Sequence, residues 1–193
     1  MKSTKVRTIE YRRKREGRTN YRKRIELFKS NKPRLIVRKS IRGISAQIAE
    51  FNPKGDVILA SANSNELKKY GFKTIKGNIV SAYFVGLLIG KKATAKGIRE
   101  AILDIGINTS TKGSRIYAVV KGAIESGLKV PVSEEMLPSQ NRLEGRHIEN
   151  WAKESRSKSK EAFSLYEKNN IKIDEISKYF NDIKKRILTE YGG

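Results

Sequence analysis

The stretch RLIVRKSIRGISAQIAEFNPKGDVILASA, residues 34–62, decides the fold of this chain. It contains three apolar, β-rich runs at 34–38, 44–51 and 57–62. The second run alternates apolar and polar side chains with period two, which is typical of a strand with one buried face. Gly43 marks a turn after the first run, and NPKGD at 52–56 marks a turn after the second. Because connections this short join antiparallel neighbours, the stretch predicts a three-strand antiparallel meander.

The residues that follow predict helices around one more strand. We expect helices at 66–70, 79–95 and 115–125, and a fourth strand from Ile98 to Ile107. Ser64 and Asn78 are the expected N-caps of the first two helices. Ala82, Gly86 and Gly90 lie four residues apart, which predicts a stripe of small residues where the second helix sits close to a sheet. The expected fold class is therefore α/β, a mixed sheet containing the antiparallel meander and flanked by helices.

Positive charge dominates the composition and is concentrated at the start of the chain. The 193 residues include 42 Lys or Arg and 20 Asp or Glu, a formal net charge of +22. An excess of this size indicates a polyanionic partner. Residues 1–33 hold 13 basic and 3 acidic residues, whereas residues 134–193 hold 12 and 11. We therefore expect a basic arm at 1–33, an α/β core at 34–132 and a helical C-terminal extension at 133–193.

The arm has the features of a nucleic-acid-binding segment. Basic clusters at 12–15 and 22–24 alternate with Tyr11, Tyr21 and Phe28. Apolar periodicity is almost absent, and ordering one residue costs roughly 1–2 kcal/mol, so the arm is not expected to fold alone. It can become ordered on a phosphate backbone, with release of counterions, while its aromatic rings stack on unpaired bases.

The C-terminal part has the pattern of helices and little net charge. Five apolar residues recur at steps of three and four, which predicts an amphipathic helix: Ile173, Ile176, Phe180, Ile183 and Ile187. Asp174 is its expected N-cap, and SRSKSK at 155–160 is expected to be a flexible joint. The apolar face needs a surface to cover, either the α/β unit or neighbouring proteins. With so little net charge, this part is expected to serve assembly rather than RNA binding.

Residue content argues against an enzyme. The chain has no cysteine and one histidine, which excludes a disulfide framework and a thiolate or multi-histidine metal site. GLLIGKK at 86–92 is similar to a phosphate-binding loop, but three residues instead of four separate its glycines, and Lys92 replaces the required Ser or Thr. The first strand carries Arg34 and Arg38 but no acid, and Asp104 is at most an isolated ligand, so no two-metal hydrolytic site is expected.

These observations predict a soluble, intracellular protein that binds a polyanion, with no enzyme activity and no cofactor or metal. The start MKSTKVRTIEYRRKREGR has no apolar stretch after its charges, so a secretory signal is not expected. Two alternatives remain open: a metal-dependent nuclease of similar strand order, and a general basic nucleic-acid-binding protein that compacts DNA.

Six segments carry a resemblance to a known family. They are RLIVRKSIRGISAQI (34–48), ILASANSNELKKYGFK (58–73), GNIVSAYFVGLLIGKKATAKGI (77–98), LDIGI (103–107), GSRIYAVVKGAIESGLKVP (113–131) and LEGRHIENWA (143–152). In this order they resemble the large-subunit ribosomal protein that binds 5S ribosomal RNA, in the archaeal and eukaryotic form with a C-terminal helical extension. The resemblance implies a structural constituent of the cytoplasmic large subunit that helps attach 5S rRNA to the large-subunit rRNA in the central protuberance. Its implied partners are 5S rRNA, large-subunit rRNA and neighbouring large-subunit ribosomal proteins, without a membrane or a small-molecule substrate.

The arm and the resemblance together give the expected RNA contacts. The arm contributes Lys5, Arg7, Tyr11, Arg12, Arg13, Lys14, Arg15, Arg18, Tyr21, Arg22, Lys23 and Arg24. Carried over by position, the family's RNA contacts fall on Arg34, Arg38, Lys39, Ser40, Arg42, Lys68, Lys69, Tyr70, Lys73, Thr109, Ser110, Thr111, Lys112 and Arg115. The deep major groove of an RNA helix is closed to side chains, so such contacts go to phosphates, 2′-hydroxyls and splayed bases.

Overall fold

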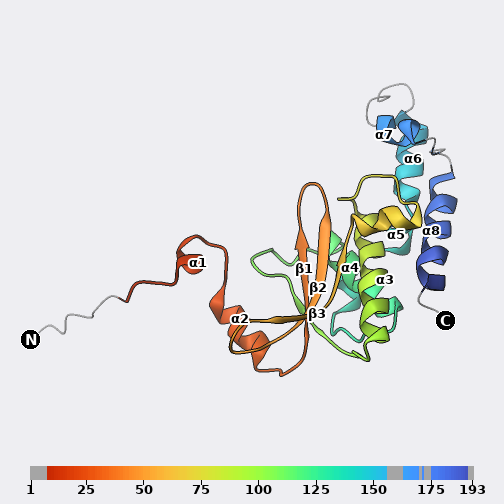
Figure 1. The fold of residues 1–193 in the computed structure, drawn as a ribbon. Helices are drawn as coiled ribbons and strands as arrows, with labels where there is room; N and C mark the ends of the chain where they lie inside the picture. Colours follow the sequence, from red (N-terminus) through yellow and green to blue (C-terminus); the bar gives the residue numbers. More distant parts are fainter. Residues whose placement is uncertain (1–7, 156–162, 170, 172–174, 191–193) are drawn as a thin grey trace, which may run out of the picture.

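A four-stranded mixed sheet forms the centre of the protein, seen in a computed structural model that describes residues 8–155, 163–169, 171 and 175–190 (Figure 1). The strands are β1 (Arg34–Lys39), β2 (Ile44–Glu50), β3 (Val57–Asn63) and β4 (Ile102–Asp104), in the order β3-β2-β1-β4. The first three strands pair antiparallel, and β4 pairs parallel with β1. The predicted meander and the mixed sheet are both confirmed.

The fourth strand is much shorter than the predicted 98–107. It spans Ile102–Asp104 because the chain leaves the sheet on either side. Before it, the Ala101 N–H donates to the Lys129 carbonyl at 3.0 Å. After it, the Asp104 carboxylate accepts the Gly106 N–H at 2.8 Å, and Gly106 turns the chain with φ 63°.

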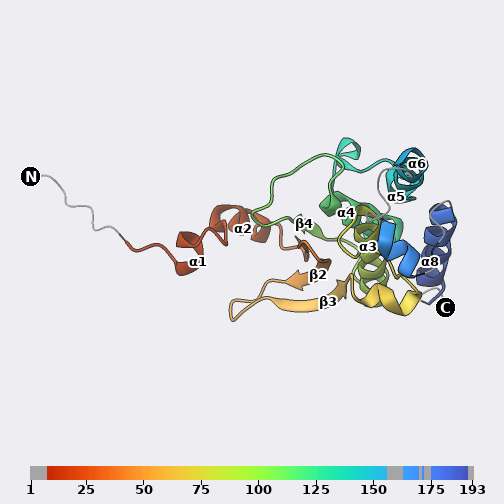
Figure 2. The same ribbon diagram turned by 90° about the horizontal axis from the view of Figure 1, so that it is seen from above.

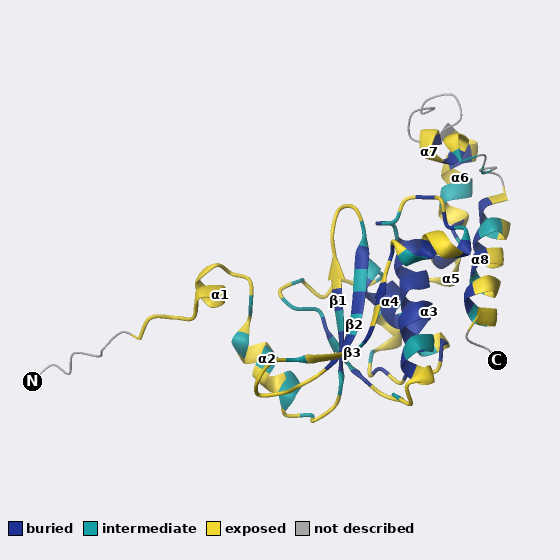
Figure 3. Ribbon diagram, viewed as in Figure 1, coloured by how far each residue is buried: buried dark blue, intermediate teal, exposed yellow. Residues whose placement is uncertain are grey.

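Two long helices cover one face of the sheet, as Figures 1 and 2 show. They are α3 (Ile79–Ala95) and α4 (Arg115–Glu125), with the bounds that the sequence predicts. Asn78 caps α3, because its side-chain oxygen accepts the Ser81 N–H at 2.7 Å. Figure 3 shows α3 buried along most of its length, since the sheet, α4 and the C-terminal helices all pack around it.

The stripe of small residues on α3 faces α4 rather than the sheet. A methyl group on Gly86 would overlap the backbone of Val119, and one on Gly90 would lie 2.9 Å from the Ala123 carbonyl oxygen. Gly122 of α4 approaches α3 in the same way, because a methyl group there would overlap the Tyr83 carbonyl. The predicted close approach is therefore real, but its partner is a helix.

The connection between β3 and α3 contains a short 3₁₀ helix, η1 (Glu66–Tyr70), which ends at Gly71 with φ 86°. Ser64 does not cap it, contrary to the prediction. Its hydroxyl accepts the Ile44 N–H at 3.1 Å and so joins the ends of β2 and β3 instead. A second 3₁₀ turn, η2 (Glu134–Met136), begins the C-terminal part.

The C-terminal helices pack against the α/β unit. They are α5 (Gln140–Leu143), α6 (Arg146–Ser155), α7 (Ser164–Lys168) and α8 (Ile176–Glu190). Four of the five predicted apolar stripe residues are buried in the common core: Ile176, Phe180, Ile183 and Ile187. The Phe180 ring lies 6.0 Å from the ring of Phe72 and 6.1 Å from that of Phe84, between centroids. Of the two surfaces considered for the stripe, the α/β unit is thus the one it covers.

Some predicted C-terminal features lie outside the described residues: Ile173, the cap Asp174, and residues 156–160 of the joint. Among the described helices, none combines the length and apolar character that a membrane crossing needs.

Candidate nucleic-acid interface

The second half of the arm folds against the face of the sheet that α3 and α4 leave open (Figure 2). After a single turn, α1 (Arg12–Arg15), the chain forms α2 (Tyr21–Phe28), which Asn20 caps. The Phe28 ring lies 4.3 Å from that of Phe51, at the end of β2. The arm is not expected to fold alone, and α2 packs against the core, where its aromatic residue finds an apolar partner.

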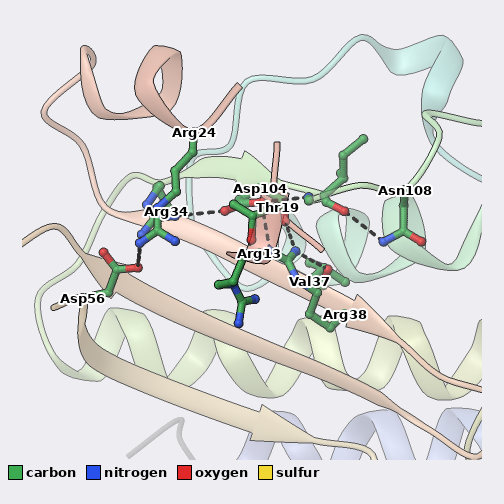
Figure 4. A network of polar contacts seen from close by, with 11 residues as sticks. Arg13, Thr19, Arg24, Arg34, Val37, Arg38, Asp56, Asp104 and Asn108 are labelled. Atoms are coloured by element: carbon green, nitrogen blue, oxygen red, sulfur yellow. Dashed lines mark hydrogen bonds and ion pairs between the residues drawn. The ribbon is translucent and has the colours of Figure 1, made fainter. Parts of the chain in front are cut away.

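A network of ion pairs, in which arginines and aspartates alternate, joins α2 to the sheet (Figure 4). Asp56, after β2, lies 2.9 Å from Arg24 of α2 and 2.7 Å from Arg34 of β1. Asp104 of β4 lies 2.9 Å from Arg34 and 3.1 Å from Arg38. The guanidinium of Arg34 also lies 4.8 Å from the centre of the ring of Phe28, in cation–π geometry.

Arg34 is a structural residue, and the expectation that it faces RNA is wrong. Its side chain is only 3% exposed and paired with two carboxylates, so it cannot reach a phosphate. Arg38 is different, because its side chain remains 45% exposed while it contacts Asp104.

Sequence reasoning missed Asp56 and Asp104 as organising residues. An arginine within the apolar run 34–37 was the available signal, because a buried cation needs a counter-charge. Asp104 is one of two acids in the predicted fourth strand, and the structure places this strand beside β1, so that Asp104 meets Arg34.

A groove of about 680 Å³ runs between α2 and the chain around β4. We call it the arm groove; its basic lining residues are Arg13, Arg18, Lys23, Arg24 and Arg38. The loop 105–108 after β4 forms the facing wall. The groove therefore presents cations from the arm and from the sheet to one ligand.

The cations of the arm differ in how strongly carboxylates already compensate them. Arg12 and Arg18 both pair with Glu16, and Lys14 pairs with Glu10. Within the described part of the chain, five exposed basic residues of the arm have no carboxylate within ion-pair distance: Arg13, Arg15, Arg22, Lys23 and Lys29. Lys5 and Arg7 lie outside the described residues. Local pairs this exposed contribute little stability, so Arg12, Lys14 and Arg18 can exchange them for contacts with a polyanion.

The two tyrosines of the arm contact each other. Their ring centroids are 5.3 Å apart, and Tyr11 is mostly exposed. Together with Ile9 and Ile107 they line an open hollow beside the arm groove. An unpaired base could stack on this pair, which fits the predicted role of the aromatic residues.

A second hollow, of about 420 Å³, lies at the turn between β1 and β2 and is called the hairpin pocket. Its lining residues include Arg38, Lys39, Ser40, Arg42, Ser45, Asn63, Asn65 and Lys76. Lys39, Ser40 and Arg42 are exposed at the turn between β1 and β2, as expected. Lys76 was not among the predicted contacts.

The half-buried Arg115 joins the turn between β1 and β2 to the start of α3. Its guanidinium donates to the Gly77 carbonyl at 2.6 Å and to the Ser40 carbonyl at 3.2 Å. The turn and the start of α3 also touch directly, since a methyl group on Gly77 would lie 2.6 Å from the Ile41 carbonyl oxygen. Arg115 therefore holds the turn against α3, in addition to any contact with RNA.

The remaining predicted contacts divide by exposure. Lys68, Lys69 and Lys73 are exposed, whereas Tyr70 is buried in the core, so its predicted direct contact is wrong. The loop residues Thr109, Ser110, Thr111 and Lys112 are exposed. Lys112 pairs with Glu135 at 2.7 Å, and the Ser110 hydroxyl contacts that of Tyr117 at 2.5 Å.

The two aspartates of the ion-pair network, Asp56 and Asp104, each pair with two arginines. Within the described residues, no group of three or more His, Cys, Asp or Glu side chains could hold a metal ion. Asp104, the acid considered as an isolated ligand, instead pairs with two guanidiniums. The geometry thus gives the nuclease alternative no support.

The chain matches the model of a known protein family. The family is described as "Ribosomal large subunit proteins 60S L5, and 50S L18", and its model matches residues 5–99 and 93–133. The matched residues include the arm, the whole sheet, α3 and α4, and therefore both the arm groove and the hairpin pocket.

Proposed function

Because the chain belongs to the family of ribosomal large-subunit proteins 60S L5 and 50S L18, we propose that it binds 5S ribosomal RNA and helps attach it to the large-subunit rRNA in the central protuberance. Family membership makes it a structural rather than catalytic component of the cytoplasmic ribosome, with rRNA and ribosomal proteins as partners. The choice of 5S rRNA is the step that goes beyond membership.

One observation carries the proposal: the two cationic hollows share a lining residue, Arg38. This residue lines both the arm groove and the hairpin pocket, so cations run from the arm across the open end of the sheet to the β1–β2 turn. A broad surface of this kind suits the phosphates and shallow minor groove of a folded RNA. This face does not present a single recognition helix of the kind that enters the major groove of DNA.

We propose that the arm and the α/β core share this task. The arm supplies cations that have no carboxylate partner. The core orients them through α2 and the arginine–aspartate ion pairs. Charges held in place before binding lose less entropy on association than those of a flexible tail.

The test measures the affinity of the full chain for 5S rRNA against an unrelated structured RNA of similar length and against duplex DNA. We expect 5S rRNA to be preferred at least about tenfold, a difference of roughly 1.4 kcal/mol. The variant Arg42→Glu should weaken 5S binding, whereas Lys185→Glu on the exposed side of α8 makes the same charge change away from the site and should have little effect. Equal binding to all three nucleic acids would identify a general basic binder, and magnesium-dependent RNA cleavage would identify a nuclease.

A further inference from the structure

The strand β3 is the last strand on one side of the sheet, with β2 as its neighbour (Figure 2). Backbone groups on the outer side of such a strand can pair with a strand of another molecule. The sequence of β3, VILASAN, begins with residues that favour strands and contains neither a charged residue nor a proline. An edge with this composition is one at which copies of a chain can join, unless the protein covers it.

The pairing with β2 shows which backbone groups of β3 point outward. The Ser64 N–H, directly after β3, donates to the Ile44 carbonyl of β2 at 2.9 Å. Because the backbone groups of successive residues in a strand point to opposite sides, those of Ser61 and Asn63 point away from β2. Leu59 lies where the register between the two strands shifts. These residues form the outer side of β3, which we call the β3 edge.

Two lysines of α3 bind carbonyls of the β3 edge. The Lys92 ammonium donates to the Ser61 carbonyl at 2.8 Å, and the Lys96 ammonium donates to the Leu59 carbonyl at 2.5 Å. Four residues of a helix advance about 6 Å, and two residues of a strand advance about 6.8 Å. Because these two spacings are similar, each lysine can reach one outward carbonyl.

Glu66 of η1 covers the next position of the β3 edge. One of its carboxylate oxygens accepts the Asn63 N–H at 3.0 Å, and the other binds the Lys92 ammonium at 2.5 Å. The side chains of Lys92 and Glu66 are only 25% and 33% exposed, so solvent screens this ion pair less than a pair on the open surface. Three positions of the edge, residues 59, 61 and 63, thus each have a backbone group bound by a side chain.

We propose that Lys92 and Lys96, with Glu66, close the β3 edge to strand addition, and that loss of the two lysines lets β3 pair antiparallel with β3 of a second copy of this chain. Each ammonium occupies a carbonyl that an incoming strand needs, and its charge opposes burial in a new sheet contact. A two-fold axis would bring the same uncharged residues together from both copies. The inference goes beyond the proposed function, because it concerns the chain without RNA.

The test uses the full chain without RNA at about 1 M salt, where the Debye length is roughly 3 Å and the repulsion between two strongly basic copies is screened. The wild-type chain should sediment as a monomer. Lys92→Met/Lys96→Met keeps two unbranched helix formers but removes both ammonium groups. We expect this variant to dimerise, seen as about a twofold increase in mass by analytical ultracentrifugation. Hydrogen exchange of the outward Ser61 N–H should slow in the dimer, because the added strand binds it.

Lys91→Met/Lys121→Met is the matched control, because it removes the same charge from α3 and α4. Lys91 lies about 100° around α3 from Lys92, so this variant should stay monomeric. Lys92→Arg/Lys96→Arg keeps a cationic donor for each carbonyl and should also stay monomeric.

Two further variants show where the copies join and whether folding matters. Ser61→Pro, added to the Met double variant, removes an N–H that points away from β2, so it spares the pairing with β2 and should restore the monomer. Lys96→Met alone leaves the Lys92–Glu66 pair in place and opens the edge only at Leu59. It should dimerise more weakly than the double variant, and it decides the question if the double variant lacks a cooperative unfolding transition.

Three results would overturn the inference. If the folded Lys→Met variants stay monomeric, the lysines are not what closes the edge. A dimer that persists with Ser61→Pro, or in which the Ser61 N–H exchanges as fast as in the monomer, would place the contact elsewhere on the molecule. A wild-type chain that dimerises under the same conditions would show that the β3 edge is open although both lysines are present.

Discussion

Arg34 and Asp104 form an ion pair inside the contact between the arm and the sheet, with 2.9 Å between Nη1 and Oδ2, although 70 residues separate them in the sequence. The side chains are 3% and 9% exposed. Each also contacts a partially exposed residue of opposite charge, Asp56 for Arg34 and Arg38 for Asp104. The pair thus links the structural interior to an arginine whose side chain is 45% exposed.

Replacing Asp104 with Ala should destabilise the protein strongly. The change leaves the buried Arg34 guanidinium with one carboxylate instead of two, and breaking a buried pair costs about 3–5 kcal/mol. Chemical denaturation measures this loss as a change in the free energy of unfolding. Glu135→Ala is the control, because it breaks the exposed pair with Lys112 and should cost less than about 1 kcal/mol. Similar losses for both variants would mean that the Arg34–Asp104 pair contributes no more than a surface pair.

Two N-terminal deletions should separate the charge of the arm from its packing. Removing residues 1–19 takes away most arm cations but keeps α2, so it should flatten the salt dependence of RNA binding with little change in stability. Removing residues 1–30 also deletes the Phe28–Phe51 and Arg24–Asp56 contacts and exposes Arg34. This deletion should therefore lower the unfolding temperature as well. If both deletions have the same unfolding temperature, α2 is not docked in solution.

Local patterns were enough to predict the meander and the helices η1, α3 and α4. The meander followed from period-two alternation and short turns, and the start of α3 followed from Asn78, whose cap acts on a backbone N–H three residues away. What the sequence could not provide was the partner of each surface. The small-residue stripe of α3 signalled a close approach, but only the tertiary structure shows that Gly86 meets Val119 of α4.

The predicted RNA contacts show the same division. Exposed cations such as Arg42 were identifiable because charge without compensation is visible in the sequence. Arg34 and Tyr70 were misassigned because burial depends on neighbours distant in the chain, namely α2 for Arg34 and the C-terminal helices around Tyr70. Tyr179 gave no sequence signal, since its role consists of two hydrogen bonds to a distant backbone.

Gly86→Ala should destabilise the protein by about 3 kcal/mol, because the added methyl group overlaps the Val119 backbone and the two helices must separate. Gly97→Ala is the informative control. Gly97 has φ 75° but open space around it, so its substitution carries only the backbone strain, about 1–2 kcal/mol. Denaturant midpoints of both variants, at equal m-values, compare the two costs. A smaller loss for Gly86→Ala than for Gly97→Ala would contradict the close α3–α4 contact.

Because residues 134–193 carry little net charge, charge alone predicts that a fragment ending near Pro131 binds RNA almost normally. The contacts of α8 change this prediction. The fragment lacks α8. It therefore exposes Phe72 and Phe84, which pack on Phe180 in the full chain, and it loses the hydrogen bonds of Tyr179 to residues 71 and 73. The fragment should therefore unfold at a lower temperature than the full chain and bind 5S rRNA more weakly.

Phe180→Ala in the full chain separates the two causes of this weakening. The truncation of a buried aromatic ring should cost about 3–5 kcal/mol in the free energy of unfolding. Tyr179 and its two hydrogen bonds to residues 71 and 73 remain in this variant. If the loop contacts are what RNA binding needs, Phe180→Ala should keep near-normal affinity at temperatures where it is folded, whereas the fragment should not. Should the fragment match the full chain in both affinity and unfolding temperature, the C-terminal helices would have no part in holding the RNA-binding surface, and their role would be confined to assembly.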